Sequence, residues 1–309
     1  MRKHKISLLC AVLCAALLFS AVPALAEGAG AAAGAPVAEN LELNTYRNVS
    51  VGGRLSAVDP EGDAMTFEIT TQPSKGTVEL TDDGRFVYTP DTNRKGRDYF
   101  GYRAVDETGA RSQEATVIIK IEKQKTQTTY ADMAGHPSAY AATALAENGI
   151  FTAEMVGGAY VFSPERYVTR GEFLSMCMTL SGDELLSGVA ATGFADDAEI
   201  AEWLKPYVAT ALMDGVVSGY SVSGGAVFEP NEAVTWQEAA VMLDNVLDTT
   251  EVAATAISGT VSDWATQATA NLAACGVITE GEAFSEPLTR ADAAEMLVRA
   301  LEVLAERQD

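Results

Sequence analysis

The chain has 309 residues, with 21 Lys and Arg against 43 Asp and Glu, which gives a formal net charge of −22. This length is more than one compact domain usually needs, and a hydrophobic content of 48% is enough to build ordinary cores. Binding to nucleic acid or to anionic lipid requires clustered cations, and a chain this acidic does not supply them. Nucleic acid and anionic membrane surfaces are therefore not expected as partners.

Residues 1–26 predict a secretory signal peptide. Arg2, Lys3 and Lys5 precede an apolar run over 6–22, and Ala24-Leu25-Ala26 has the small-x-small form of a cleavage site. The alternative is a retained signal anchor, but the run is short and ends at a good cleavage site. We therefore expect a secreted protein with no membrane span after cleavage. Residues 27–39, rich in Ala, Gly and Pro, predict a flexible leader.

Residues 40–125 predict an all-β domain. Short runs rich in Val, Thr, Ile, Tyr and Phe occur at 65–70, 76–80, 85–89, 99–105 and 115–121, separated by turn signals such as Asp82-Asp83-Gly84. Runs of period two at this spacing indicate an antiparallel β-sandwich of about seven strands.

Four motifs in this region occur in the order found in a known family. They are DPEGDAMTF at 59–67, PSKGTV at 73–78, GRFVYTP at 84–90 and DYFGYRAVD at 98–106. The region resembles the bacterial cadherin-like, immunoglobulin-like (Ig-like) surface repeats. The resemblance implies a spacer or adhesive module rather than an enzyme.

Some cadherin-like modules bind calcium, and four side chains here have suitable oxygens: Asp59, Glu61, Asp63 and Asp106. The alternative is that Asp and Gly at these places only favour tight turns. No complete ligand set is visible, and the sequence predicts no other cofactor.

Beyond a polar link at 126–129 the pattern becomes helical and repeats three times. We define a first copy at 130–188, a second at 189–250 and a third at 255–309. Each copy starts with an Asp-bearing segment (Asp132, Asp196 and Asp263) and continues with a helical run that ends in Gly followed by apolar residues. Trp203 and Trp264 stand twelve residues before that Gly in the second and third copies, whereas the first copy has Pro137.

The sharpest feature of each copy is a capping box before an apolar helix. The motifs are TRGE at 169–172, TWQE at 235–238 and TRAD at 289–292. Thr with an acid three residues later favours a helix start, and Asp292 is the weaker acid for this purpose. Apolar residues then recur with helical spacing, for instance Ala293, Met296, Leu297, Ala300, Leu301 and Leu304.

The triplet resembles the surface-layer homology (SLH) domain, which anchors proteins to Gram-positive cell walls. The resemblance implies an all-α, pseudo-threefold unit that binds secondary cell-wall polysaccharide, often pyruvylated, in grooves between copies. The motif arginine is present as Arg170 and Arg290, but Trp236 replaces it in the second copy. At most two grooves are therefore expected to bind.

The residues themselves also suggest an anion site. Residues 126–309 contain only six cations, and two of them, Arg170 and Arg290, follow a capping Thr at a helix start. A helix N-terminus offers unpaired N–H groups, and a guanidinium fits a carboxylate bidentately. Trp203 and Trp264 could face a sugar ring, and Asp132, Asp196 and Asp263 are further candidate glycan-binding residues. The alternative is that both arginines pair with acids and that both Trp rings belong to the core.

Catalysis is not expected. His136 is the single His beyond the predicted signal peptide, and no His/Cys cluster or phosphate-binding Gly loop is present. Cys177 and Cys275 predict two buried thiols, with a disulfide as the alternative. The main hypothesis is a non-catalytic protein of a Gram-positive-type cell surface that displays an Ig-like module. The alternatives are a surface-layer assembly protein that contacts other surface proteins, and an adhesin whose β-domain binds an external ligand.

Overall fold

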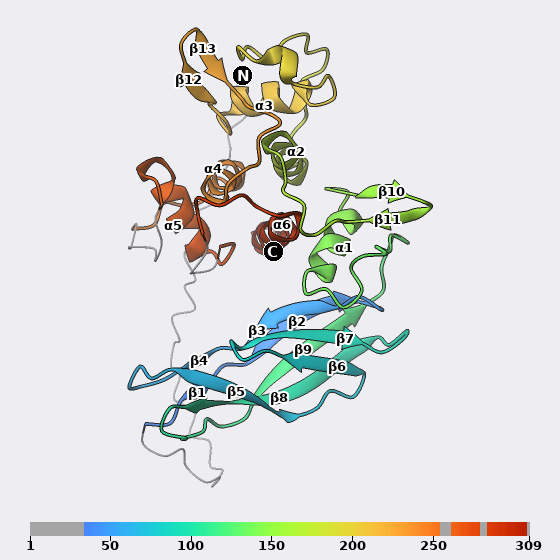
Figure 1. The fold of residues 1–309 in the computed structure, drawn as a ribbon, viewed down its shortest axis with the longest axis vertical. Coiled ribbons are helices and arrows are strands. Elements are labelled where there is room, and N and C mark those ends of the chain that lie inside the picture. Colours follow the sequence, from blue (N-terminus) through green and yellow to red (C-terminus); the bar gives the residue numbers. More distant parts are fainter. Residues whose placement is uncertain (1–33, 254–260, 279–282, 308–309) are drawn as a thin grey trace.

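The computed structural model describes residues 34–253, 261–278 and 283–307. Figure 1 shows a β-rich domain (the β-domain, residues 34–123) next to a mainly helical domain (residues 130–307), so the multidomain layout is confirmed. The predicted signal peptide and residues 27–33 of the leader lie outside the described residues. Within the described part, no helix is long and apolar enough to cross a membrane.

The β-domain consists of two main sheets packed face to face. The larger has the order β2 (Leu41–Tyr46), β9 (Ala115–Glu122), β8 (Gly96–Asp106) and β5 (Met65–Thr71); the smaller has the order β3 (Val51–Arg54), β7 (Arg85–Pro90) and β6 (Gly76–Leu80). In β9 every second residue is buried, which is the period-two pattern expected of a strand with one face on a core. Seven strands in two sheets agree with the sequence-based prediction.

Two details of the β-domain differ from the prediction. The sandwich is not wholly antiparallel, because β2 runs parallel to β9. The leader is also shorter than predicted, because β1 (Val37–Ala38) pairs with β4 (Ala57–Val58) and Ala35 is buried. The sequence pattern did not predict the parallel direction of β2 or the pairing of β1 with β4, because each depends on chain segments far away in sequence.

The helical domain contains six α-helices among the described residues, and it is not all-α as predicted. The helices are α1 (Ala139–Glu147), α2 (Arg170–Ser181), α3 (Lys205–Asp214), α4 (Trp236–Leu247), α5 (Thr266–Ala274) and α6 (Arg290–Glu306). Two β-hairpins lie between them: β10 (Glu154–Val156) with β11 (Ala159–Val161), and β12 (Tyr220–Val222) with β13 (Gly225–Val227). Three-residue strands are too short to show a sequence period, which is why they were missed.

The capping boxes before α2, α4 and α6 are all present, with Thr169, Thr235 and Thr289 as N-caps. The segments just before these boxes are joined head to tail. The Val168 N–H donates to the Leu288 carbonyl (3.0 Å), Leu288 N–H to the Val234 carbonyl (2.9 Å), and Val234 N–H to the Val168 carbonyl (3.0 Å). This closed cycle fixes the starts of α2, α4 and α6 relative to one another.

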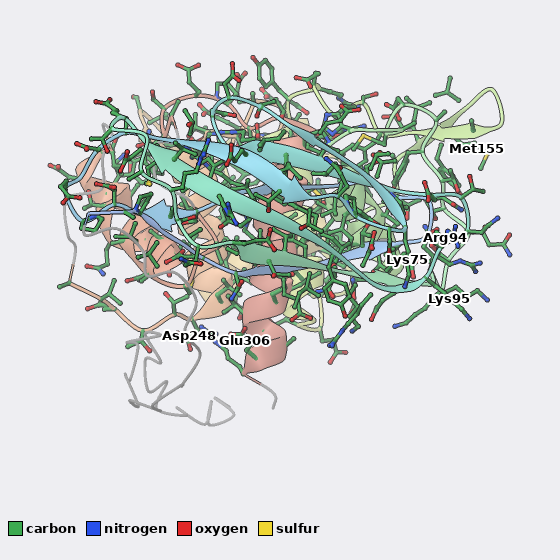
Figure 2. All side chains as sticks on the ribbon, turned by 90° about the horizontal axis from the view of Figure 1, so that it is seen from below. Lys75, Arg94, Lys95, Met155, Asp248 and Glu306 are labelled. Atoms are coloured by element: carbon green, nitrogen blue, oxygen red, sulfur yellow. The ribbon has the colours of Figure 1, made fainter. Side chains whose placement is uncertain are left out.

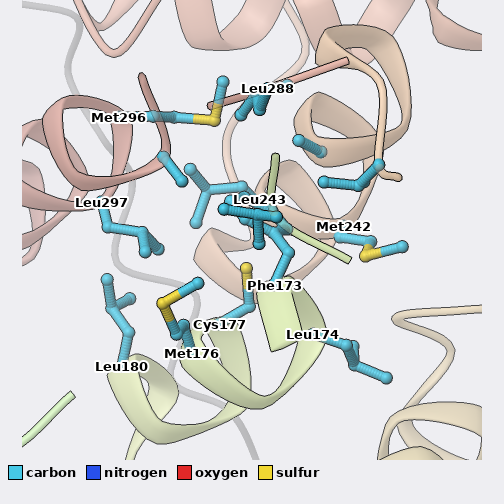
Figure 3. Packing of buried hydrophobic residues seen from close by; sticks show 14 of the residues in the cluster. Phe173, Leu174, Met176, Cys177, Leu180, Met242, Leu243, Leu288, Met296 and Leu297 are labelled. Atoms are coloured by element: carbon cyan, nitrogen blue, oxygen red, sulfur yellow. The ribbon is translucent and has the colours of Figure 1, made fainter. Parts of the chain in front are cut away.

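The core of the helical domain lies where α2, α4 and α6 meet (Figure 3). Phe173, Leu243 and Leu297 are fully buried in it, one from each helix. Cys177 is also fully buried, but Cys275 is only half-buried, and both thiols are free. The prediction of a buried thiol therefore holds for Cys177 and was wrong for Cys275, and the alternative disulfide is not formed.

The two domains are in direct contact. The Gly52 N–H donates to the Pro137 carbonyl at 2.7 Å, and a Cβ on Gly52 would lie 2.7 Å from the Pro137 Cβ, so only glycine fits this approach. The Tyr46 and Tyr140 rings pack with centroids 5.4 Å apart. The Glu147 carboxylate accepts the Thr126 N–H at 2.7 Å, which ties the polar link to α1.

Charge is distributed unevenly over the molecule. Figure 2 shows Lys75, Arg94 and Lys95 together at one end of the β-domain, away from Asp248 and Glu306 of the helical domain. Along the sequence, residues 27–125 hold 12 Lys and Arg against 16 Asp and Glu, whereas residues 126–309 hold 6 against 27, so the helical domain carries most of the excess acid.

Glu295 on α6 gives the helical domain a pH-dependent stability. Burial raises the pKa of this carboxyl, while Arg299 and a hydrogen bond with Ser138 act in the opposite direction and Glu302 adds to the rise. For a raised folded-state pKa, the stabilising contribution is full below the unfolded pKa of about 4.3 and is lost as pH rises through the folded-state pKa. We expect the Tm of the helical domain to be higher at pH 5 than at pH 7 in calorimetry.

The substitution Glu295→Gln removes this titration, so it should raise the Tm at pH 7 and flatten the pH dependence. The exposed Glu184→Gln is the matched control and should leave both unchanged. An unchanged pH slope in the Glu295→Gln protein would contradict the assignment.

Candidate functional site

An open groove lies at the start of α2, where the first copy meets the second. The groove, here called the Arg170 groove, has a volume of about 320 Å³. Arg170 comes from α2, Val217 and Tyr220 from the segment after α3, and Glu238 from α4. Trp264 of the third copy completes the wall, and its ring is 56% exposed. Three copies thus contribute to one concave surface.

The Arg170 guanidinium is held firmly in this groove. Its Nε donates to the Phe228 carbonyl at 2.9 Å and its Nη1 to the Tyr220 hydroxyl at 3.0 Å, while the Glu238 carboxylate lies 3.4 Å from Nη1. The Tyr220 ring faces the guanidinium at 4.7 Å. Burial lowers the pKa of Arg170 and Glu238 opposes this shift. These contacts involve Nε and Nη1 of the guanidinium.

One part of the sequence argument was wrong: the helix start does not offer free N–H groups. The Arg170 N–H donates to the Glu232 carbonyl (2.8 Å) and Gly171 N–H to the Pro230 carbonyl (2.9 Å), both in the second copy. The Glu172 N–H is taken by the capping Thr169. Any anion in this groove must therefore be recognised by side chains rather than by the α2 terminus.

Arg290 occupies the corresponding place at the start of α6, but its surroundings are closed. The space beside it has a volume of only about 10 Å³ and is lined by Phe151, Phe162 and Glu172, among others. The Arg290 Nη1 donates to the Phe162 carbonyl at 2.9 Å, and the Phe151 ring lies 5.2 Å from the guanidinium.

Two acids and a second arginine complete the surroundings of Arg290. The carboxylate of Glu154 lies 3.5 Å from Arg290 Nη2 and 3.0 Å from Arg166 Nη1. Glu172 lies 3.9 Å from Arg290 Nη2 and 3.0 Å from Arg166 Nη2. The alternative that the motif arginines pair with acids of a neighbouring copy is thus realised at both positions. Two carboxylates share two guanidinium groups at Arg290, and Glu238 of the second copy lies 3.4 Å from Arg170 Nη1.

The third corresponding position holds Trp236, which is half-buried against the core of the helical domain. The wall segment expected to face it includes residues 279–282, which lie outside the described residues. The expectation that this position lacks an anion-binding arginine follows from the sequence alone.

The three predicted Asp residues have different surroundings. The Asp132 carboxylate accepts the N–H groups of Phe162 (2.8 Å) and Ser163 (2.6 Å), and Asp196 accepts those of Phe228 (2.9 Å) and Glu229 (2.7 Å). Asp132 therefore holds the loop whose Phe162 carbonyl accepts a hydrogen bond from Arg290, and Asp196 holds the loop whose Phe228 carbonyl accepts one from Arg170. Asp263 is exposed at the start of η2 (Asp263–Ala265). Contacts of these carboxylates with glycan stay a prediction.

The two predicted Trp residues are both exposed, so the alternative that they belong to the core is wrong. Trp264 lines the Arg170 groove, whereas Trp203 is 58% exposed and packs edge-on against Tyr207. Sequence reasoning missed Tyr220, Glu238 and Val217 as groove residues. Aligning the second copy on the first would have placed them opposite Glu154, Glu172 and Phe151.

The calcium candidates form hydrogen bonds within turns. The Asp59 carboxylate accepts the N–H groups of Glu61 and Asp63, and Asp106 accepts those of Thr108 and Ala110. Among the described residues, no group of three or more His, Cys, Asp or Glu side chains is placed to hold a metal ion. Calcium binding at these residues stays untested.

The fold and the groove together define a two-domain protein in which a repeat-built helical domain carries the candidate binding site. Family comparisons agree with this division. The bacterial cadherin-like domain matches residues 33–123, and the S-layer homology domain matches residues 129–174 and 193–240. The chain therefore has a bacterial cadherin-like domain followed by two S-layer homology domains.

One curated relative is the "Surface-layer 125 kDa protein" of Lysinibacillus sphaericus, which is 29% identical over 144 residues. The match covers 46% of this chain but only 11% of that protein. Among solved structures, an endo-fucoidan hydrolase of glycoside hydrolase family 107 is 24% identical over 29% of this chain and 14% of its own, with a TM-score of 0.24. A mutant SrpA adhesin of Streptococcus sanguinis is 17% identical over 31% of this chain and 63% of its own, with a TM-score of 0.25. Scores this low support no functional argument.

Proposed function

We propose that the helical domain anchors a secreted, non-catalytic protein to the secondary polysaccharide of a Gram-positive-type cell wall. In this proposal residues 255–309 are a third, diverged S-layer homology repeat, and the three copies form a pseudo-threefold unit. The two matched domains and the surface-layer relative support a cell-surface location. The cyclic hydrogen bonds between Val168, Val234 and Leu288 support the threefold arrangement.

The Arg170 groove is the observation that carries the binding proposal. It has the volume of a sugar-sized site, a buried guanidinium on one side and an exposed indole on the other. A guanidinium binds a carboxylate, such as that of a pyruvate ketal, and an aromatic face packs against the apolar side of a sugar ring. The ligand class that fits is therefore a polysaccharide with carboxylate-bearing sugars.

Co-sedimentation with cell walls tests this function. The chain from residue 27 onward should sediment with walls that keep their polysaccharide and stay in solution with walls stripped of it. Because Trp264 is exposed, Trp264→Ala should weaken binding by about tenfold or more with little effect on folding. Trp203→Ala is the matched control, since this equally exposed ring does not line the Arg170 groove.

Sedimentation that is independent of the polysaccharide would contradict the anchoring proposal and favour assembly with other surface proteins. Binding that needs the polysaccharide but is indifferent to Trp264 would keep the anchor and move its site away from this groove.

A further inference from the structure

We propose that the helical domain has one competent anion-binding groove among the two that keep the motif arginine, and that Phe151 and Glu154 close the other. This inference rests on the proposed function and specifies where and how often the ligand binds. It starts from the difference in volume at two equivalent positions: about 320 Å³ beside Arg170 and about 10 Å³ beside Arg290.

The first cause is steric. Phe151 and Val217 are equivalent, because each is the second residue after the glycine that ends the preceding helical run, Gly149 or Gly215. The centroid of the Phe151 ring lies 5.2 Å from the Arg290 guanidinium and 6.0 Å from the centroid of the Phe162 ring, and Phe151 lines the small space beside Arg290. Val217 lacks these ring atoms, and the Arg170 groove is open at the same place. A ligand would have to displace Phe151 to reach Arg290.

The second cause is electrostatic. Glu154 and Tyr220 are equivalent, because each begins the first strand of its hairpin and pairs with the last residue of the second, Val161 or Val227. At Arg290 this position supplies a carboxylate, which adds to that of Glu172. At Arg170 it supplies a neutral phenol that donates to Glu238. The Arg290 Nη2 therefore already has two carboxylate partners, which Arg166 shares. The acids that act on Arg170 are Glu238, 3.4 Å from Nη1, and the more distant Glu229. An incoming carboxylate would have to displace the existing partners from Nη2 at Arg290.

Together these differences assign the ligand to the Arg170 groove. Arg290 then acts as a structural residue that joins the third copy to the first through the Phe162 carbonyl. The ligand class is a sugar with one carboxylate of pyruvate-ketal type. Of the two positions that keep the motif arginine, only the Arg170 groove binds it, so each chain binds one such sugar at these positions.

Exchanging the equivalent residues tests the assignment. The chain from residue 27 onward would be titrated calorimetrically with the 4,6-pyruvate ketal of a methyl hexopyranoside, using its methyl ester as the uncharged control. We expect one site in the unaltered chain. Val217→Phe should weaken binding at least a hundredfold and abolish wall sedimentation. The double variant Phe151→Val/Glu154→Tyr should bind two ketals per chain.

Val222→Phe, the same chemical change at an exposed hairpin residue, is the matched control and should bind like the unaltered chain. Thermal unfolding of each variant verifies folding. Unchanged binding by a folded Val217→Phe protein, or two sites in the unaltered chain, would overturn the one-groove inference while leaving the wall anchor intact. Failure of the unaltered chain to bind either walls or ketal would overturn the proposed function, and the inference with it.

Discussion

Replacing Asp98 by alanine is expected to lower the free energy of unfolding of the β-domain by about 3–5 kcal/mol. The carboxylate is 1% exposed. It accepts the Ser74 N–H (3.0 Å) and hydroxyl (2.9 Å), the Lys75 N–H (2.8 Å) and the Tyr88 hydroxyl (2.8 Å). Truncation leaves these donors without an acceptor, and the Tyr88 side chain is fully buried, so water cannot replace it.

The effect of Asp98 should also appear in the acid stability of the β-domain. Burial opposes the charged carboxylate, but the hydrogen bonds from Ser74, Lys75 and Tyr88 outweigh it and hold the pKa of Asp98 below its ordinary value. For a lowered folded-state pKa, the stabilisation is present above the unfolded pKa of about 3.9 and is lost as pH falls through the folded-state pKa. The Asp98→Ala protein should lack this part of the acid transition.

The two domains can be followed separately in the full chain. All three Trp residues lie in the helical domain, so Trp fluorescence reports on that domain and circular dichroism on both. Asp82→Ala, at an exposed turn position, is the control and should change stability by less than about 0.5 kcal/mol. A loss below about 1 kcal/mol in the Asp98→Ala protein would show that the network contributes little.

Replacing Phe173 by alanine is expected to destabilise the helical domain by about 3–5 kcal/mol. Phe173, Ala239 and Ala293 are equivalent, each lying three residues into α2, α4 or α6, and all three are almost completely buried. One large and two small side chains fill the space at this level of the core. With alanine at all three positions a cavity would remain, because the cyclic backbone bonds before the helices limit collapse.

Denaturant unfolding monitored by Trp fluorescence measures this loss. Thr179→Ala, at an exposed position of the same helix, should leave the midpoint nearly unchanged. If Phe173→Ala and Thr179→Ala behave alike, the helices close around the cavity and the proposed restraint by the cyclic bonds is wrong.

Local sequence signals predicted those parts of the fold that depend on neighbouring residues. The alternating apolar residues of β9 and the capping boxes at Thr169, Thr235 and Thr289 specify their elements through interactions within a few residues. The parallel pairing of β2 with β9 and the two hairpins of the helical domain were not predicted, because each depends on distant partners or is too short to show a period.

The candidate site was predicted in part for the same reason. Arg170, Arg290 and Trp264 could be identified from their place in each copy, since the motifs recur at fixed positions. Whether the space beside each arginine is open depends on side chains from a different copy, Val217 in one case and Phe151 in the other.

The sequence by itself determined the acidic, two-domain organisation, the sandwich strands, the three helix starts and the identity of the motif arginines. Only the tertiary structure decided what surrounds those arginines. The N–H groups at the start of α2 are taken by carbonyls of the second copy, and Phe151 and Glu154 occupy the space beside Arg290. The physical reason is that a helix start follows from local hydrogen bonding, whereas a groove is the volume left after segments far apart in the chain have packed together.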